Sequence, residues 1–399
     1  MCVEKVKNRF RVLMVAGDFV WPPNHGGRVD MWERLNALKC LGCHVDLLFT
    51  AYARPLPEEL QVVEKVAEEI HFVQRRKGLR SHVSALPYQL QSRRELGHVK
   101  LDFARYDLVI LESEYVLPVV AAERFSKAAG VVLRVHNREP AYFVALSRAT
   151  SSFFASVFYR LEAIRFAWVN IAQRRLLRSM DAWMVSTDEC RMETRFARTH
   201  WVPPGIGKIR GPIVHESHGT VMFVGSLFMP NNVEGLRWYL DRVHPLLVRE
   251  PHYRVVIAGR GGEALTQELA RYDRVTMVPD PSDEALEEIY RAADVFVAPM
   301  FHGAGVKLKV LNALAHGLPV VATQVSNQGT GFLDGVHLDV SDVPGEFASR
   351  VRELLADGAL GRKRVLAAQD LLRERYDFAR FFSEHYLVGG ARGVQQGAV

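Results

Sequence analysis

Short apolar runs alternate with segments of helical periodicity in the first half of the chain. Residues 28–42 carry Met31, Leu35 and Leu38 at helical spacing, and Gly42 follows where a C-terminal cap belongs, so this segment predicts a helix. The apolar runs around it predict strands at 10–19, 44–52, 68–74, 106–113 and 129–137. Strands that alternate with helices predict a parallel α/β sheet with helices on both faces.

The same alternation restarts in the second half of the chain. Predicted strands lie at 219–227, 253–261, 274–280, 295–300 and 318–323. Predicted helices lie at 231–247, 263–272, 286–294 and 310–317. The region between the halves is rich in Pro, Gly and His without periodicity, which is typical of a linker.

Two doubly wound, Rossmann-like domains of similar size follow from this pattern. We expect a first domain at 1–202, a linker at 203–218, a second domain at 219–375, and a helix and tail at 376–399 that pack back on the first domain. Ligands of doubly wound domains bind at the carboxyl ends of the strands, so two domains that face each other predict a cleft. The loops at such ends are 17–28, 112–115, 136–139, 225–232, 259–262 and 299–309.

Composition narrows the class of protein. The chain has 399 residues, of which 48% are hydrophobic and 24% charged, as in a globular protein of about two domains. The net charge of +6 is a modest excess that suits phosphates, nucleic acid or an anionic membrane surface. Cys40 and Cys43 form a CxxC on a predicted helix without a second pair, so we interpret them as structural thiols. Without a signal-peptide pattern or a spanning apolar run, a cytoplasmic protein is expected.

Glycines and lysines gather at the start of one predicted helix. Gly303 and Gly305 allow close approach of the backbone, and Lys307 and Lys309 follow them. Helix-start amides and two cations together favour an anion. The alternative is a pair of ordinary exposed lysines, but lysine is unfavourable at the positive end of a helix dipole unless an anion is present. Helical direction indicates that only one of the two points at the anion.

A second glycine loop follows the first predicted strand. It contains His25, Gly26, Gly27 and Arg28, and its glycines would admit a sugar or a phosphate. The alternative is an ordinary turn before a helix. Its place after the first strand of a doubly wound domain favours binding.

Three further residues follow other first-domain strands. His136 ends a predicted strand, although a lone histidine is more often structural. Glu112 and Glu139 are weaker candidates, because either can cap a helix or pair with an arginine.

Five segments resemble bacterial family 4 glycosyltransferases of the GT-B fold. They are WPPNHGGRVDMWERLNALKCLG, LRVHNREPAYF, VPPGI, FVGSLFMPNNVEGLRWYL and GAGVKLKVLNALAHGLPVVAT, in family order and spacing over nearly the whole chain. The resemblance implies transfer of a sugar from a UDP-, GDP- or dTDP-sugar, with retention and without a metal or other cofactor. It also implies that Lys309 binds the diphosphate and that His136 contacts the transferred sugar.

The resemblance implies a donor-binding set in the second domain. Its members are Gly225, Ser226, Asn231, Asn232, Arg260, Gly303, Ala304, Gly305, Val306, Leu308 and Asn312. The family pattern has Glu where this chain has Ala304 and Asn312, and cations where it has Ser226 and Asn231 or Asn232. Asn312 can still bond a ribose hydroxyl, though without a charge. Arg260 is a candidate to compensate for the lost cations.

Two segments rich in basic residues are candidates for binding a membrane or another anionic partner. One holds Arg75, Arg76, Lys77, Arg80, Arg93 and Arg94; the other, 152–178, mixes arginines with aromatic residues. They suit a solvated basic face plus a core helix, or docking on an anionic membrane that holds a lipid-linked glycan. Nucleic acid is the third choice, and no nucleic-acid motif is present.

These patterns favour a glycosyltransferase of cell-surface polysaccharide or glycoconjugate biosynthesis, acting on a glycan or lipid-linked acceptor at the inner face of the cell membrane. In the expected front-face displacement, Lys307, Lys309 and backbone amides stabilise the leaving diphosphate. An inverting enzyme would instead need a base, for which His25 or Asp30 is the candidate. The alternatives are a catalytically silent GT-B partner subunit, suggested by Asn312 and Ser226, and a sugar-nucleotide epimerase.

Overall fold

The computed structural model describes residues 9–23, 26–76, 78, 84–119, 130–213, 218–261, 263–269, 271–303 and 305–388. The candidate residues His25 and Ala304 lie outside the described residues, as do Lys77 and Arg80 of the first basic segment. The chain forms two compact units. The first unit comprises 1–136, 164–205 and 376–399, and the second comprises 137–163 and 206–375.

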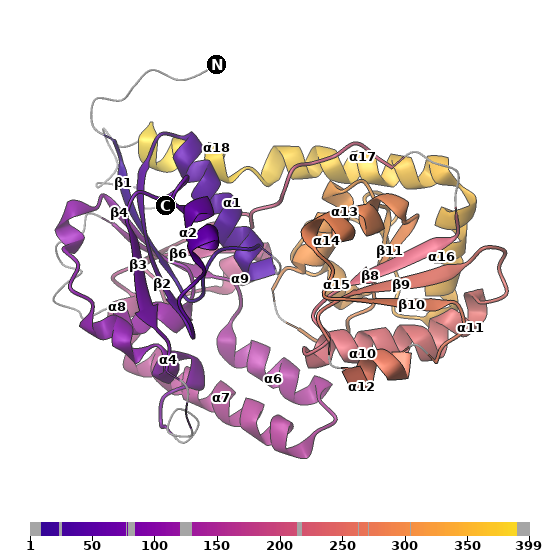
Figure 1. Ribbon diagram of the computed structural model, residues 1–399, viewed down its shortest axis with the longest axis horizontal. Coiled ribbons are helices and arrows are strands. Elements are labelled where there is room, and N and C mark those ends of the chain that lie inside the picture. The colour runs from indigo at the N-terminus through magenta and orange to yellow at the C-terminus, as the bar shows by residue number, and fades with distance from the viewer. Residues whose placement is uncertain are drawn as a thin grey trace. The chain divides into compact units, whose positions relative to one another are not determined.

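The first unit is built on a seven-stranded parallel sheet in the order β3-β2-β1-β4-β5-β6-β7 (Figure 1). The strands are β1 (Arg11–Ala16), β2 (His44–Ala51), β3 (Ile70–Gln74), β4 (Leu108–Leu111), β5 (Val131–Val135), β6 (Asp181–Met184) and β7 (Arg198–Trp201). The residues of β4 are all buried, as are all but the first residue of β1 and the two end residues of β2. This explains the near-continuous apolar runs in the sequence.

Helices cover this sheet. They are α1 (Gly26–Cys40), α2 (Pro57–Val63), α4 (Tyr88–Ser92), α8 (Arg174–Leu177), α9 (Thr187–Met192) and α18 (Phe378–Phe382), with α7 (Phe153–Ala172) shared between the two units. Short 3-10 helices lie at Arg94–His98, Phe103–Arg105 and Glu114–Val119. A π-helix at Ser383–Leu387 continues α18.

The C-terminal segment packs on the first unit, as the fold prediction requires. α18, yellow in Figure 1, lies beside α1. Trp183 of β6 is fully buried, and its indole Nε1 donates to the Tyr386 hydroxyl over 3.2 Å. Its ring meets those of Phe378 and Phe382 edge to face.

The second unit holds a six-stranded parallel sheet in the order β10-β9-β8-β11-β12-β13 (Figure 1). The strands are β8 (Thr220–Val224), β9 (Arg254–Gly259), β10 (Val275–Pro279), β11 (Val295–Ala298), β12 (Val320–Ala322) and β13 (Asp339–Val340). Its helices include α6 (Glu139–Ala149), α10 (Pro230–Trp238), α11 (His244–Leu247), α12 (Glu263–Leu269), α13 (Asp283–Ala292), α14 (Leu308–Ala315), α15 (Gln324–Asn327), α16 (Pro344–Ala356) and α17 (Gly358–Arg375), with a π-helix at Tyr239–Val243. The predicted pair of doubly wound domains is therefore confirmed.

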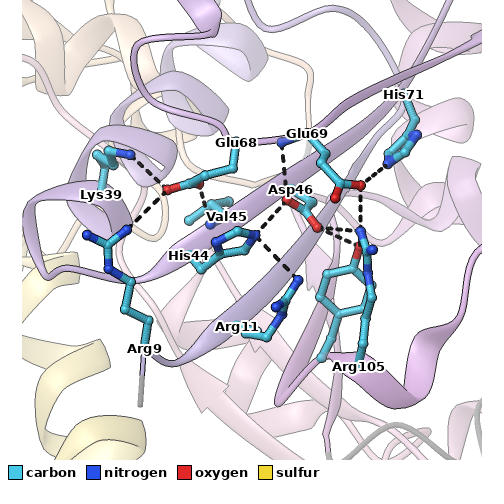
Figure 2. A network of polar contacts seen from close by, with 11 residues as sticks. Arg9, Arg11, Lys39, His44, Val45, Asp46, Glu68, Glu69, His71 and Arg105 are labelled. Atoms are coloured by element: carbon cyan, nitrogen blue, oxygen red, sulfur yellow. Dashed lines mark hydrogen bonds and ion pairs between the residues drawn. The ribbon is translucent and has the colours of Figure 1, made fainter. Parts of the chain in front are cut away.

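A polar network closes the amino ends of the first strands (Figure 2). Asp46 is fully buried and accepts hydrogen bonds from Arg105 Nη2 at 2.7 Å and from the Tyr106 hydroxyl at 2.8 Å. Glu68 accepts from Lys39 Nζ and from the Val45 amide, both at 2.8 Å. Ligands of this fold class bind at the opposite edge of the sheet, so we interpret the network as structural.

Candidate active site

Two lysines lie at the start of α14 in the second unit, at the carboxyl edge of its sheet. Lys307 is the residue before the helix, and Lys309 lies in its first turn. The Lys309 side chain is held in place by Phe223, whose ring centroid lies 4.4 Å from Nζ, and by Asn232, whose Oδ1 accepts from Nζ at 2.7 Å. Lys307 is 8% exposed, and its Nζ donates to the Gly305 carbonyl at 2.7 Å.

Lys309 has no carboxylate counter-charge among the residues that the structure describes. The ion pairs formed among the described residues include none with this lysine, and its hydrogen-bond partner Asn232 is neutral. Burial, followed by repulsion from Lys307, lowers the pKa of Lys309 to about 7. An anionic ligand would therefore favour the protonated, cationic form of Lys309.

Two glycines make room for these lysine side chains. A Cβ placed on Gly225 would lie 2.6 Å from Lys309 Nζ, and one on Gly303 would lie 3.1 Å from Lys307 Cε. Gly303 also has a φ of +139°, which few other residues adopt. The predicted glycines and lysines of the second domain thus lie together, and the glycines admit the lysines.

The other predicted donor-binding residues differ in their burial and in their hydrogen bonds. Asn232 is 7% exposed and its Nδ2 donates to the Ser226 carbonyl at 2.7 Å, whereas the buried Oδ1 of Asn231 has no hydrogen-bond partner among the described residues. Val306, Leu308 and Asn312 are partly buried along the start of α14. Arg260 is exposed and bonds Asp280 Oδ1 at 3.0 Å, so its guanidinium already has a carboxylate partner.

In the first unit, His136 belongs to a buried network of ion pairs. Its Nε2 lies 2.9 Å from Asp30 Oδ2, and Asp30 also bonds Arg34 and Arg134, the latter at 3.2 Å. Arg34 Nε donates to Glu112 Oε1 at 2.8 Å. Asp30 and both arginines are fully buried, while His136 is partly exposed at the end of β5.

The network keeps Asp30 ionised. Burial alone would raise its pKa, but Arg134, Arg34 and His136 together hold the pKa of Asp30 well below its usual range. The backbone amide of Gly205 adds a hydrogen bond to Asp30 Oδ1 at 2.6 Å. A carboxylate fixed in this way orients the imidazole of His136.

The ligand atoms of Asp30, Glu112 and His136 lie within 4.8 Å of one another, a spacing that could hold a metal ion. However, both carboxylates already accept hydrogen bonds from Arg34, and Asp30 also accepts from Arg134. Two buried guanidinium groups compete with a divalent cation for the same oxygens. We therefore interpret this cluster as an ion-pair network.

The other predicted residues of the first domain that the structure describes lie outside the network of Asp30 and His136. Gly26 and Gly27 open α1, and Arg28 folds back onto Asp18, whose Oδ2 accepts from Arg28 Nη2 at 2.8 Å. Glu139 is 5% exposed and opens α6, which belongs to the second unit.

Two arginines of the first basic segment pack within the fold. The Arg75 guanidinium lies 4.4 Å from the Tyr52 ring centroid, and Arg93 is 4% exposed and donates to the Gly17 carbonyl. Arg76 pairs with Glu95 at 2.9 Å. Arg75 and Arg93 therefore pack within the fold, whereas Arg76 is 52% exposed beside Glu95.

Sequence reasoning missed Arg34 and Arg134. Arg134 interrupts the apolar run of β5, and Arg34 stands one turn after Asp30 on the buried side of α1. A charged residue at a position that the apolar pattern buries is the signal that could have identified both.

Comparisons with known proteins agree with this fold. The family model described as glycosyl transferases group 1 matches residues 218–357. An uncharacterized 44.6 kDa protein in the cps region of Klebsiella pneumoniae is 33% identical over 397 residues, which cover 94% of this chain and 98% of that protein. The D-inositol 3-phosphate glycosyltransferase of Mycolicibacterium smegmatis is 36% identical over 139 residues, 29% of this chain and 32% of that one. The chain belongs to the group 1 glycosyltransferases.

Solved structures share the GT-B architecture. Sucrose-phosphate synthase from Thermosynechococcus elongatus superposes with a TM-score of 0.68 at 16% identity, over 96% of this chain and 100% of that one. Anabaena HepE in complex with UDP and glucose gives a TM-score of 0.64 at 14% identity, over 96% and 100%. At this identity the likeness shows the fold. Within the described residues, no helix has the length and apolar character needed to cross a membrane.

Proposed function

We propose that the second unit binds the diphosphate of a nucleotide-diphosphate sugar through Lys309, with Lys307 beside it. The observation that carries this proposal is Lys309, whose Nζ is held by Asn232 and Phe223 and forms no ion pair with a carboxylate of the described residues. A diphosphate would supply the missing negative charge in charge-assisted hydrogen bonds. Lys307 and the amides at the start of α14 would add to its binding.

Stabilisation of the leaving diphosphate by these groups supports a metal-independent transfer. The bond between the anomeric carbon and the diphosphate oxygen breaks as the acceptor oxygen bonds to the same face of that carbon, and the acceptor proton passes to the departing diphosphate. Charge then builds up on the diphosphate, where Lys309 and Lys307 act. No side-chain base is needed for this retaining reaction. His136, oriented by Asp30, is proposed to hold the transferred sugar.

A cell-surface polysaccharide or glycoconjugate is the proposed product, with a glycan or lipid-linked acceptor. The Klebsiella pneumoniae relative is described as a protein in a cps region, which supports polysaccharide synthesis. The Anabaena structure holds UDP and glucose, so UDP-sugars are the first donors to test, followed by GDP- and dTDP-sugars.

The experiment that tests donor binding compares UDP with uridine by calorimetry. Lys309→Met should weaken UDP binding by about 1.5–3 kcal/mol, the range for a lost charge-assisted hydrogen bond, and should leave uridine binding unchanged. Lys363→Met, an exposed lysine on α17, is the matched control and should behave as wild type. Equal losses for UDP and uridine would contradict the diphosphate assignment.

A catalytically silent partner subunit is the second candidate. It is favoured by the neutral side chains of Ser226 and Asn312, which stand where the family it resembles has charged groups. Slow hydrolysis of a bound UDP-sugar by the purified chain separates the two, because a silent subunit would bind the donor and leave it intact. An epimerase would instead convert the free UDP-sugar into its epimer, which NMR detects.

A further inference from the structure

Helix α7 (magenta in Figure 1) exposes a stripe of large apolar side chains. Six of them repeat every three or four residues, and at 3.6 residues per turn they fall within an arc of roughly 80°. Phe154 borders this arc and is 85% exposed. We call these residues the α7 stripe: Phe153, Phe154, Val157, Leu161, Ile164, Trp168 and Ile171.

The α7 stripe lies opposite the face of α7 that packs against the rest of the protein. The opposite side of α7 is packed, since Phe166 is fully buried and Ala163 and Val169 are each 6% exposed. The helix is thus anchored by one face while solvent reaches 67% of Trp168 on the other. A contiguous apolar surface of this kind marks an interaction site, unlike single scattered apolar residues.

The charges beside the stripe have one sign. Every exposed charged residue from 151 to 179 is an arginine, namely Arg160 on α7 and Arg174, Arg175 and Arg178 on or next to α8. The acidic residue in this span is Glu162, which is 1% exposed and lies on the packed side. Exposed apolar side chains on α7 are therefore followed directly in the chain by exposed cations on and next to α8.

We propose that the α7 stripe and the α8 arginines dock the protein on an anionic lipid bilayer. Apolar and aromatic side chains would enter the boundary between head groups and acyl chains, with α7 parallel to the membrane. Arg174, Arg175 and Arg178 would lie against lipid phosphates. This inference goes beyond donor binding and does not depend on it.

Charge decides against a second copy of this chain as the occupant. A two-fold dimer would bring the same patch of each subunit together. Arg160 and the α8 arginines would then meet a surface whose exposed residues include no carboxylate between 151 and 179. A bilayer with anionic lipids satisfies both the apolar stripe and the arginines.

The test measures binding of the full-length protein to vesicles, without sugar donor. The wild type should sediment with vesicles of phosphatidylcholine and phosphatidylglycerol far more than with phosphatidylcholine alone. Ile164→Ser with Trp168→Ser should lower the partition coefficient by about tenfold or more. A triple Arg→Ser variant at 174, 175 and 178 should lower it by roughly tenfold to a hundredfold and remove the preference for the anionic lipid.

Matched controls lie on other surfaces of the chain. Leu333→Ser with Leu366→Ser changes two exposed apolar residues, and Arg242→Ser with Arg249→Ser changes two exposed arginines. Both controls should bind as wild type. Calorimetry with UDP on the same samples reports donor binding separately, so failure of one proposal is distinguishable from failure of the other.

Three results would overturn the inference. The first is equal binding of the wild type to both kinds of vesicle, or to neither. The second is a stripe variant that binds as tightly as wild type. The third is a wild-type dimer by light scattering that the stripe variant dissociates, without vesicle binding, which would assign α7 to a second copy.

Discussion

Replacing Lys309 by methionine should stabilise the unliganded protein while it weakens diphosphate binding. The substitution keeps the approximate length of the side chain against Phe223 and removes the partly buried charge. In the native state the pKa of Lys309 falls from 10.5 to about 7, because the ammonium is desolvated and lies near Lys307. The native fold therefore disfavours the protonated lysine that the unfolded chain carries at neutral pH.

The size of this effect depends on pH. Between pH 7 and about 10.5 the unfolded chain binds more protons at Lys309 than the native state, so the contribution of Lys309 to the free energy of unfolding rises with pH through this window. At 1.36 kcal/mol per pKa unit, the lysine costs the native state up to about 4 kcal/mol at pH 7 and about 2 kcal/mol at pH 9. The variant also leaves Asn232 Oδ1 without its hydrogen-bond donor. This loss reduces the gain in the free energy of unfolding by about 1–3 kcal/mol.

The assay is urea unfolding of wild type, Lys309→Met and Lys363→Met at pH 7 and pH 9. Lys309→Met should gain stability relative to wild type at pH 7, and its stability difference from wild type should shift by about 2 kcal/mol between the two pH values. The exposed Lys363→Met control should show no such shift. If the free energies of unfolding of Lys309→Met and wild type differ by the same amount at both pH values, the native fold does not disfavour protonated Lys309, and the reasoning is refuted.

Four further results are expected. Transfer activity should survive EDTA, and a loss that Mg²⁺ or Mn²⁺ restores would contradict metal independence. Gly225→Ala should weaken UDP binding by at least tenfold, because its Cβ would lie 2.6 Å from Lys309 Nζ; unchanged affinity by calorimetry would refute this placement. His136→Ala should lower turnover by about a hundredfold with retained anomeric configuration by proton NMR, whereas an inverted product would overturn its role. Asp30→Asn should cost about 3–5 kcal/mol in urea unfolding because it weakens the counter-charge of two buried arginines, and a change below 1 kcal/mol would contradict the network.

Much of the architecture could be read from the sequence, because buried parallel strands leave apolar runs and the helices between them leave a 3.6-residue period. The placement of Lys307 and Lys309 at a helix start was accessible for the same reason: both signals are local in the chain. The partners of Lys309 could not be predicted, since Asn232 lies 77 residues away and Phe223 lies on strand β8.

Long-range pairing also explains what the sequence did not reveal in the first unit. Arg134 and Asp30 are separated by 104 residues, and Arg34 and Glu112 by 78. Side-chain type alone gives no indication that these four charges meet. The burial of Arg93 in the first basic segment could not be predicted for a related reason. Arg93 donates to the Gly17 carbonyl, which lies 76 residues away in the chain.

Lys309 differs from the buried charges of the first unit, and this contrast supports the proposed diphosphate site. In the first unit, Asp30 and Glu112 supply carboxylate counter-charges to Arg34 and Arg134 within the chain. In the second unit, Lys309 has an amide and an aromatic ring as partners. A chain that neutralises two deeply buried guanidinium groups could equally have placed a carboxylate beside one lysine. Such a carboxylate would occupy the position of an anionic substrate and repel it. Lys309, which pairs with no carboxylate among the described residues, therefore fits the proposal that the donor diphosphate supplies its counter-charge.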